Sequence, residues 1–159
     1  MDYVSERYTY LSYGLVVTTF ILILLGGYVK AISAGLACPD WPMCHGQLIP
    51  DLSDRRIFAE WFHRLWAMIN GFYMIGIAVL SYKLKSINPT LFNLSLIATF
   101  LYTVQVWLGG LTVLGELEPV IVVMHLGNAL LIIILQLTIA FVATTNTEKF
   151  MTRVTEFRK

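Results

Sequence analysis

The sequence predicts an all-α fold: an integral membrane four-helix bundle with an extracytoplasmic cysteine-bracketed loop between its first and second helices. The 159 residues are 57% hydrophobic and 13% charged, with a mean hydropathy of +0.71. A water-soluble domain of this length could not bury so much apolar surface. Four long stretches carry no charge, and a bilayer core needs roughly 20 helical residues to cross. These stretches do not alternate polar with apolar residues, which excludes the strands of a membrane barrel.

The charge-free stretches place the four helices. They run from Tyr8 to Val29, from Leu65 to Tyr82, from Ser86 to Gly115 and from Pro119 to Thr147. We expect helices over about residues 10–32, 59–82, 90–114 and 120–144, an outer loop over 33–58, and a single domain over 1–159. Ser53 is expected to cap an extension that leads into the second helix.

Lysine and arginine residues near the helix ends orient the chain. With the N-terminus inside, the inner side carries Arg7, Lys83, Lys85, Lys149, Arg153, Arg158 and Lys159, and the outer side carries Lys30, Arg55, Arg56 and Arg64. This bias predicts that both termini are cytoplasmic and that the first loop is extracytoplasmic. No Arg-rich transit sequence is present, which favours a cell membrane over an organelle. The net charge of +1 gives no indication of nucleic-acid binding.

Two histidines lie inside the predicted spans, His63 in "EWFHRLW" and His125 in "VVMHLGN". Their helices run in the same direction, so both lie about one to two turns below the outer surface. A buried imidazole needs partners for its ring nitrogens, and two interpretations provide them. Each ring makes an interhelical hydrogen bond, for example to Gln105 or Asn128, or both bind one haem iron across the bundle diagonal. The matched depth favours haem, and two ligands are too few for a typical zinc site.

A glycine pair ends the first helix in "LLGGYVK" and the third in "WLGGLTV". Each pair is followed by a helix with a histidine near its start, which indicates a weak internal repeat of two hairpins. The residues concerned are Gly26, Gly27, Gly109 and Gly110. Such residues either serve helix packing or let a flat ligand approach the backbone, and the sequence leaves both interpretations open.

Three charged residues flank the predicted site. Arg64, next to His63, is a candidate partner for a haem propionate, and Lys30 at the end of the first helix is another. The alternative, favoured for Lys30, is that these side chains snorkel to the membrane surface. Glu60 lies one turn before His63 and is a candidate for proton transfer, although its spacing from Arg64 favours a salt bridge.

The first loop contains both cysteines. Cys38 and Cys44 are separated by "PDWPM", whose two prolines favour a compact turn, so a disulfide is feasible. An oxidising outer compartment would preserve it. Its role would be local, as a lid over the site or as a redox pair. His45 suggests a metal site, but a single exposed histidine is more often only solvated.

In order along the chain, these motifs resemble the N-terminal half of the heme A synthase family. The similar segments are "GGYVKAISAGLACPDWPMCHG", "EWFHR", "VQVWLGGLTVLG" and "VVMHLGNA", which cover most of residues 25–130. The loop signature is specific, whereas the glycine pairs are not. The resemblance implies that the protein oxidises one porphyrin methyl group of haem O to the formyl group of haem A, for use in terminal oxidases.

The resemblance also implies roles for individual residues. His63 and His125 would be the axial ligands of the haem iron, Glu60 the functionally important acid, and Cys38 with Cys44 the outer-loop pair. The haem would be a b-type cofactor, the haem O substrate and haem A product, or both.

The sequence departs from the family pattern in two ways. Lys30 stands where the family often has arginine. Typical members have eight spans in two halves, whereas this chain has four. A second bundle would come from another copy of this chain, from a different protein, or not at all, and we expect a homo-oligomer. Further expected partners are the lipid bilayer, a haem O synthase and an electron donor. The alternative functions are a non-catalytic bis-histidine b-type haem-binding subunit of a respiratory complex and a plain structural membrane module.

Overall fold

The computed structural model describes residues 2–156, with side chains over residues 6–145. Four helices follow one another: α1 (Asp2–Ala31), α2 (Arg55–Leu84), α3 (Pro89–Leu114) and α4 (Pro119–Glu156). Each contains a segment that is long and apolar enough to cross a membrane. No residue between 2 and 156 belongs to a β-strand. The expected all-α class, the four spans and the cysteine-bracketed loop between the first two helices are confirmed. The described part does not include the ends of the predicted domain, residues 1 and 157–159. It also does not include the side chains of Lys149 and Arg153.

Three helices are longer than the apolar runs indicated. α1 begins at Asp2 rather than near residue 10, α2 begins at Arg55 rather than 59, and α4 continues to Glu156 rather than 144. A helix continues through polar residues for as long as its i to i−4 hydrogen bonds continue, so hydropathy marks the membrane segment and not the helix end.

Side-chain caps fix where three helices start. The carboxylate of Asp54, rather than the expected Ser53, accepts the Arg56 N–H at 2.7 Å ahead of α2. Asn88 caps α3 and Glu118 caps α4, each by accepting a backbone N–H three residues on. A proline follows each of these two caps, where its missing N–H is not needed.

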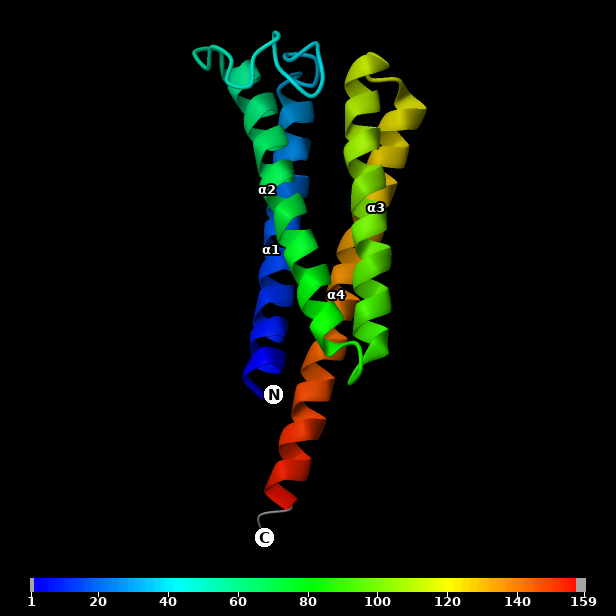
Figure 1. The fold of residues 1–159 in the computed structure, drawn as a ribbon. Helices are drawn as coiled ribbons and strands as arrows, with labels where there is room; N and C mark the ends of the chain where they lie inside the picture. Colours follow the sequence, from blue (N-terminus) through cyan, green and yellow to red (C-terminus); the bar gives the residue numbers. More distant parts are fainter. Residues whose placement is uncertain (1, 157–159) are drawn as a thin grey trace.

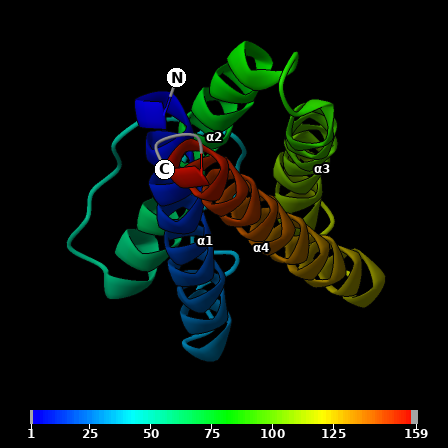
Figure 2. The same cartoon turned by 90° about the horizontal axis from the view of Figure 1, so that it is seen from below.

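The four helices pack in cyclic order, so that α2 and α4 lie on one diagonal of the bundle and α1 and α3 on the other. Figure 1 shows that α2 and α4 run in the same direction and that the hairpins α1–α2 and α3–α4 stand apart at the end that carries the first loop. Seen from below in Figure 2, α4 runs obliquely from α3 toward the start of α1. The diagonal, parallel placement of the two histidine helices agrees with the sequence prediction.

The buried core occupies the half of the bundle away from the first loop. It comprises Tyr8, Leu15, Met74, Ile77, Leu84, Leu91, Ala98, Tyr102, Ile132, Ile139 and Ala143. Hydrogen bonds also join the hairpins there, among them one between Tyr8 Oη and Ser95 Oγ at 2.9 Å and one from Tyr102 Oη to the Ala67 carbonyl at 2.6 Å. Among the described residues, the second buried cluster (Val29, Ala34 and Ala59) joins only α1, the loop and α2. The loop end of the bundle therefore has no buried apolar cluster shared by the two hairpins.

The core position of Met74 predicts a difference between two methionines of α2. Met74 is 1% exposed and Met68 is 55% exposed. We expect Met74→Ala to lower the free energy of unfolding by about 2 kcal/mol through lost packing, at the low end of the usual range because the surrounding lipid is also apolar. Met68→Ala should change it by less than about 0.5 kcal/mol. Denaturant titration in detergent measures both values, and equal effects would contradict the assignment of the core.

Candidate functional site

The two histidines lie on diagonal helices near the loop end of the bundle. His63 is eight residues after the start of α2 and His125 is six residues after the start of α4, which places them about 12 Å and about 9 Å along their helices. Both rings are half-buried. The predicted common depth agrees with this placement.

The first glycine of each pair lies directly behind a histidine ring. A Cβ added to Gly26 would lie 3.2 Å from His63 Cε1, and one added to Gly109 would lie 3.2 Å from His125 Cε1. The weak repeat in the sequence is therefore a structural one, because each hairpin holds its imidazole against a glycine in the same way. The second glycines differ: Gly27 has no neighbouring atom within 4 Å, whereas a Cβ on Gly110 would meet Trp41.

The ring nitrogens are only partly satisfied by the protein. Nδ1 of His63 and Nδ1 of His125 are buried and have no hydrogen-bond partner among the described residues. The Gln105 amide nitrogen lies 3.4 Å from His125 Nε2, donates to the His125 carbonyl at 3.0 Å, and its amide oxygen accepts from Asn128 at 2.8 Å. The interhelical contact that the sequence offered as an alternative thus exists for His125, yet it leaves a nitrogen on each ring without a partner.

This arrangement fits a haem iron better than a zinc ion. Two imidazoles at one depth on opposite helices are the kind of ligand pair that would suit a six-coordinate haem. Zinc usually takes three or four ligands, and the described residues contain no group of three His, Cys, Asp or Glu side chains that could hold a metal ion. The glycines behind the rings leave space for the imidazoles but would not tolerate larger residues.

The first loop is closed by a disulfide between Cys38 and Cys44, whose residues are 0% and 1% exposed. The carboxylate of Asp40 accepts the backbone N–H groups of His45 at 2.6 Å and Gly46 at 2.8 Å. His45 adopts a positive φ of 52° and its Nε2 lies 2.9 Å from the Ala37 carbonyl, so its ring is engaged within the loop. The loop is thus a compact turn built around Asp40 and the disulfide.

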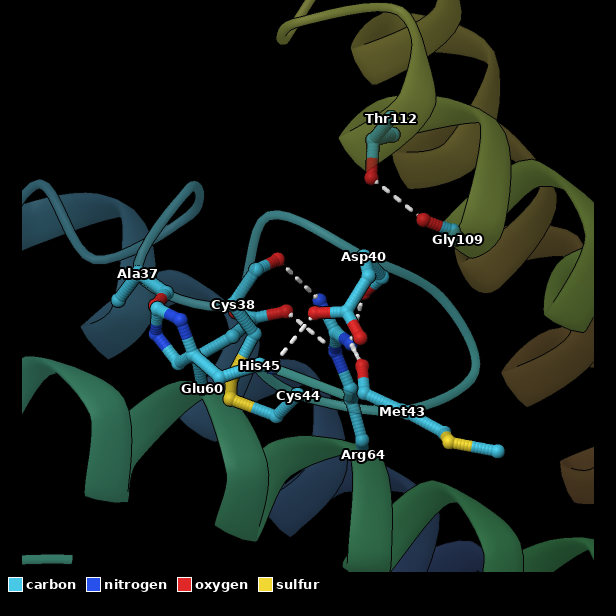
Figure 3. Close-up of polar contacts among 10 residues, drawn as sticks. All are labelled: Ala37, Cys38, Asp40, Met43, Cys44, His45, Glu60, Arg64, Gly109 and Thr112. Atoms are coloured by element: carbon cyan, nitrogen blue, oxygen red, sulfur yellow. Dashed lines mark hydrogen bonds and ion pairs between the residues drawn. A yellow bond between two sulfur atoms is a disulfide. The ribbon is translucent and has the colours of Figure 1, made fainter. Parts of the chain in front are cut away.

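Arg64 extends from α2 into this loop (Figure 3). Its Nε–H donates to Glu60 Oε1 at 2.9 Å, and its Nη atoms donate to three loop carbonyls, those of Cys38, Asp40 and Met43. The predicted Glu60–Arg64 salt bridge is therefore present, with both side chains largely buried. Four of the five guanidinium N–H groups are used within the protein, so Arg64 is mainly engaged with the loop and not available as a bidentate propionate partner.

The loop also reaches the opposite hairpin. The Trp41 ring packs against Gly110 of α3 and lies 6.1 Å, centroid to centroid, from the Trp107 ring. A Cβ added to Gly35 would meet Leu117 in the α3–α4 turn at 3.2 Å. Lys30, the other predicted propionate partner, is exposed in the last turn of α1. Sequence reasoning missed Trp41 as a contact between hairpins, and missed Gln105 and Asn128 as one network, although it named both residues separately.

The fold and the site define a multi-pass membrane protein with paired intramembrane histidines beneath a disulfide-closed loop. The model of the cytochrome oxidase assembly protein family matches residues 9–158, and the chain belongs to that family.

Named relatives agree with this assignment. A heme A synthase of Bacillus pumilus (strain SAFR-032) is 30% identical over 122 residues, which cover 73% of this chain and 39% of that protein. A heme A synthase of Erythrobacter litoralis (strain HTCC2594) is 33% identical over 138 residues, or 80% of this chain and 39% of that protein. A protoheme IX farnesyltransferase of Haloarcula marismortui is 28% identical over 107 residues, or 67% of this chain and 22% of that protein. The chain thus spans about two fifths of the length of the heme A synthases, and no solved structure matches it.

The glycines behind the histidines predict a position-specific effect on haem binding. Gly26→Val should displace the His63 ring and weaken haem binding by at least about tenfold, because the site has no room for added atoms there. Gly27→Val is the matched control, since the neighbouring position has no atom within 4 Å. Haem titration of the purified variants, followed by the Soret band, measures the effect. Equal haem affinities of Gly26→Val and Gly27→Val would show that Gly26 does not position the His63 ring.

The hydrogen bonds to Asp40 predict a pH dependence of the loop. The Gly46 N–H lowers the pKa of the Asp40 carboxyl most, partial burial opposes this, and the His45 N–H and nearby Arg64 lower it further. Because the pKa of Asp40 is lower in the folded than in the unfolded state, the ionised carboxylate stabilises the loop at pH values above the unfolded-state pKa of about 3.9. This contribution is lost as the pH falls through the folded-state pKa.

We therefore expect Asp40→Asn to lower the melting temperature at pH 7 and to differ progressively less from wild type below about pH 4. Asp54→Asn serves as the control, because asparagine is an equally good helix cap. The melting temperatures of detergent-solubilised wild type and variants are measured at pH values from 7 to 3. A gap between wild type and Asp40→Asn that stays constant with pH would contradict the assignment.

Proposed function

We propose that this chain is a heme A synthase that oxidises a porphyrin methyl group of haem O to the formyl group of haem A. The observation that carries the proposal is the pair of glycine-backed imidazoles, each with an unpartnered nitrogen, on diagonal membrane helices of a chain in this family. His63 and His125 are the residues that would hold the iron.

The bound haem would supply iron-based oxidation chemistry, and the chain's residues would position and protect it. Glu60 is 5% exposed, and within the described residues its carboxylate makes a hydrogen bond only through Oε1, to Arg64. Its Oε2 is therefore available to accept or donate a proton beside His63. The loop, held to α2 by Arg64 and to α3 by Trp41, would cover the outer end of the site and keep water from it.

We infer the surroundings of the protein from the same features. The disulfide fits an oxidising compartment, so we place the loop and both histidines at the outer side of a cell membrane, with both termini cytoplasmic. We also propose that the chain self-associates, because its four apolar helices leave lipid-facing surface against which a second copy can pack. The name of one relative describes farnesyl transfer to protoheme IX, and a protein that supplies a farnesylated haem is the partner class we expect, together with an electron donor.

One experiment tests this function against its alternative. The chain is co-expressed with a source of haem O, and the pigment is extracted and identified by mass and by its pyridine haemochrome spectrum. Haem A supports the proposal. A bis-histidine spectrum with protohaem and no formyl product would instead indicate the non-catalytic b-type haem subunit, and the lack of a Soret band would overturn both functions.

The role of Glu60 predicts a separation between binding and conversion. Glu60→Gln should lower the conversion of haem O by about 100-fold or more, since the amide cannot exchange a proton in the same way. Haem content should remain at the wild-type level. Glu116→Gln, at an exposed position in the α3–α4 turn, is the matched control. Chromatography of extracted haems gives both values, and full conversion by Glu60→Gln would remove this residue from the mechanism.

A further inference from the structure

We propose that the disulfide ring Cys38–Cys44 is a receptor for the guanidinium of Arg64, and that Arg64 is a positioning residue which couples the state of this disulfide to Glu60 and His63. The ring is the seven-residue segment that the disulfide closes. The proposed function uses Arg64 only to hold the loop over the site and assigns no redox role to the disulfide.

The ring presents backbone carbonyls to Arg64 from three of its residues. Arg64 Nη1 donates to the carbonyls of Asp40 and Met43, both at 2.7 Å, and Nη2 donates to that of Cys38 at 2.9 Å. Figure 3 shows the guanidinium lying within the turn of the loop. Carbonyls from one short segment can converge on one cation only if the segment curves tightly around it. A planar fork of donors can satisfy all three together, which a lysine ammonium cannot do in the same geometry.

The curvature of the ring has two sources in the structure. The disulfide joins its ends, with Cα atoms 4.6 Å apart, and the Asp40 carboxylate binds the two N–H groups that follow Cys44. Both cysteines are buried, so a reductant reaches the sulfur atoms only when the loop opens. Opening the loop also removes the carbonyls from Arg64. The integrity of the disulfide and the binding of Arg64 therefore depend on the same closed conformation.

Arg64 transmits this conformation to the site because it follows His63 in α2. Its Nε–H holds Glu60 Oε1 at 2.9 Å, and Glu60 lies one turn earlier on the same helix. One guanidinium thus connects the loop, the buried carboxylate and the helix segment that carries the histidine. Coupling of this kind is reciprocal, so if the oxidised ring favours bound Arg64, then Arg64 stabilises the oxidised ring to the same degree.

The redox step is an ordinary thiol–disulfide exchange with an added dithiol. The dithiol supplies two electrons and becomes a cyclic disulfide, the Cys38–Cys44 bond breaks, and each sulfur takes one proton. The chain contains no other cysteine, so the thiols that appear come from this bond alone.

The first experiment measures the dithiothreitol concentration that half-reduces the disulfide in purified full-length protein. Fluorescent maleimide labelling after acid quenching counts the thiols. Arg64→Gln should lower this concentration by about tenfold. Arg56→Gln is the matched control, because Arg56 lies on the same helix and its exposed side chain pairs with exposed Asp54. A value for Arg64→Gln within about twofold of the control would overturn the proposal.

The second experiment uses the wild-type chain, which avoids any variant that fails to fold. Phenylglyoxal modifies accessible arginines, and mass spectrometry locates the products. Arg64 should be protected in the oxidised protein and react after reduction and alkylation of the cysteines, whereas Arg56 should react in both states. Equal protection of Arg64 in the two states would contradict the receptor role.

A third measurement tests the positioning role and is the only one that rests on haem binding. Reduction of the disulfide in wild-type protein and the Arg64→Gln substitution should produce the same shift in the electron paramagnetic resonance spectrum of bound haem. Reduction of the Arg64→Gln variant should then add no further shift, and Arg64→Lys should not restore the wild-type spectrum. A full additional shift in the variant would show that Arg64 does not transmit the change. Since the thiol and phenylglyoxal experiments need no haem, their failure is distinct from failure of the proposed function.

Discussion

The two hairpins share a buried core only at the end of the bundle away from the first loop, and the site depends on this one-sided closure. Core residues from all four helices meet away from the loop, where Tyr8 and Tyr102 add hydrogen bonds between hairpins. At the other end each hairpin packs its own histidine against its own glycine, and the described residues form no buried cluster that spans both hairpins. A flat ligand between His63 and His125 would provide the inter-hairpin contact that side chains do not provide there.

The loop has to connect the hairpins at that open end, and it does so with specific contacts instead of a core. Trp41 reaches Gly110 of α3, and Gly35 meets Leu117 of the α3–α4 turn. Such contacts hold only if the loop keeps one shape, and the disulfide, Asp40 and Arg64 together fix that shape. The same features therefore connect the two halves of the bundle at the loop end, and under the proposed function they would also cover the site.

The sequence predicted the parts of the structure that arise from local and periodic patterns. Charge-free runs located the helices, and the direction of successive spans placed His63 and His125 at one depth. The helices themselves continue past these runs, in α4 as far as Glu156, since polar residues continue a helix without a hydropathy signal. The main role of Arg64 was not predictable, because its partners are backbone carbonyls, which every residue has and no sequence motif marks. The contact of Trp41 with α3 depends on the folded path of the loop and had no local signal either.

Each of the two histidines packs against a glycine in the same way, but the residues that flank them differ. Glu60 lies three residues before His63, and Arg64 directly follows it. The equivalent positions around His125 are Val122 and Leu126. Near His125, the neutral amide of Gln105 donates to the His125 carbonyl and accepts a hydrogen bond from the Asn128 amide. A ligand held between the two rings would meet an ion pair near one face and only amides near the other. Under the proposed function, proton transfer would therefore be confined to the α2 side, beneath the disulfide loop, although the backbone repeat is nearly symmetric.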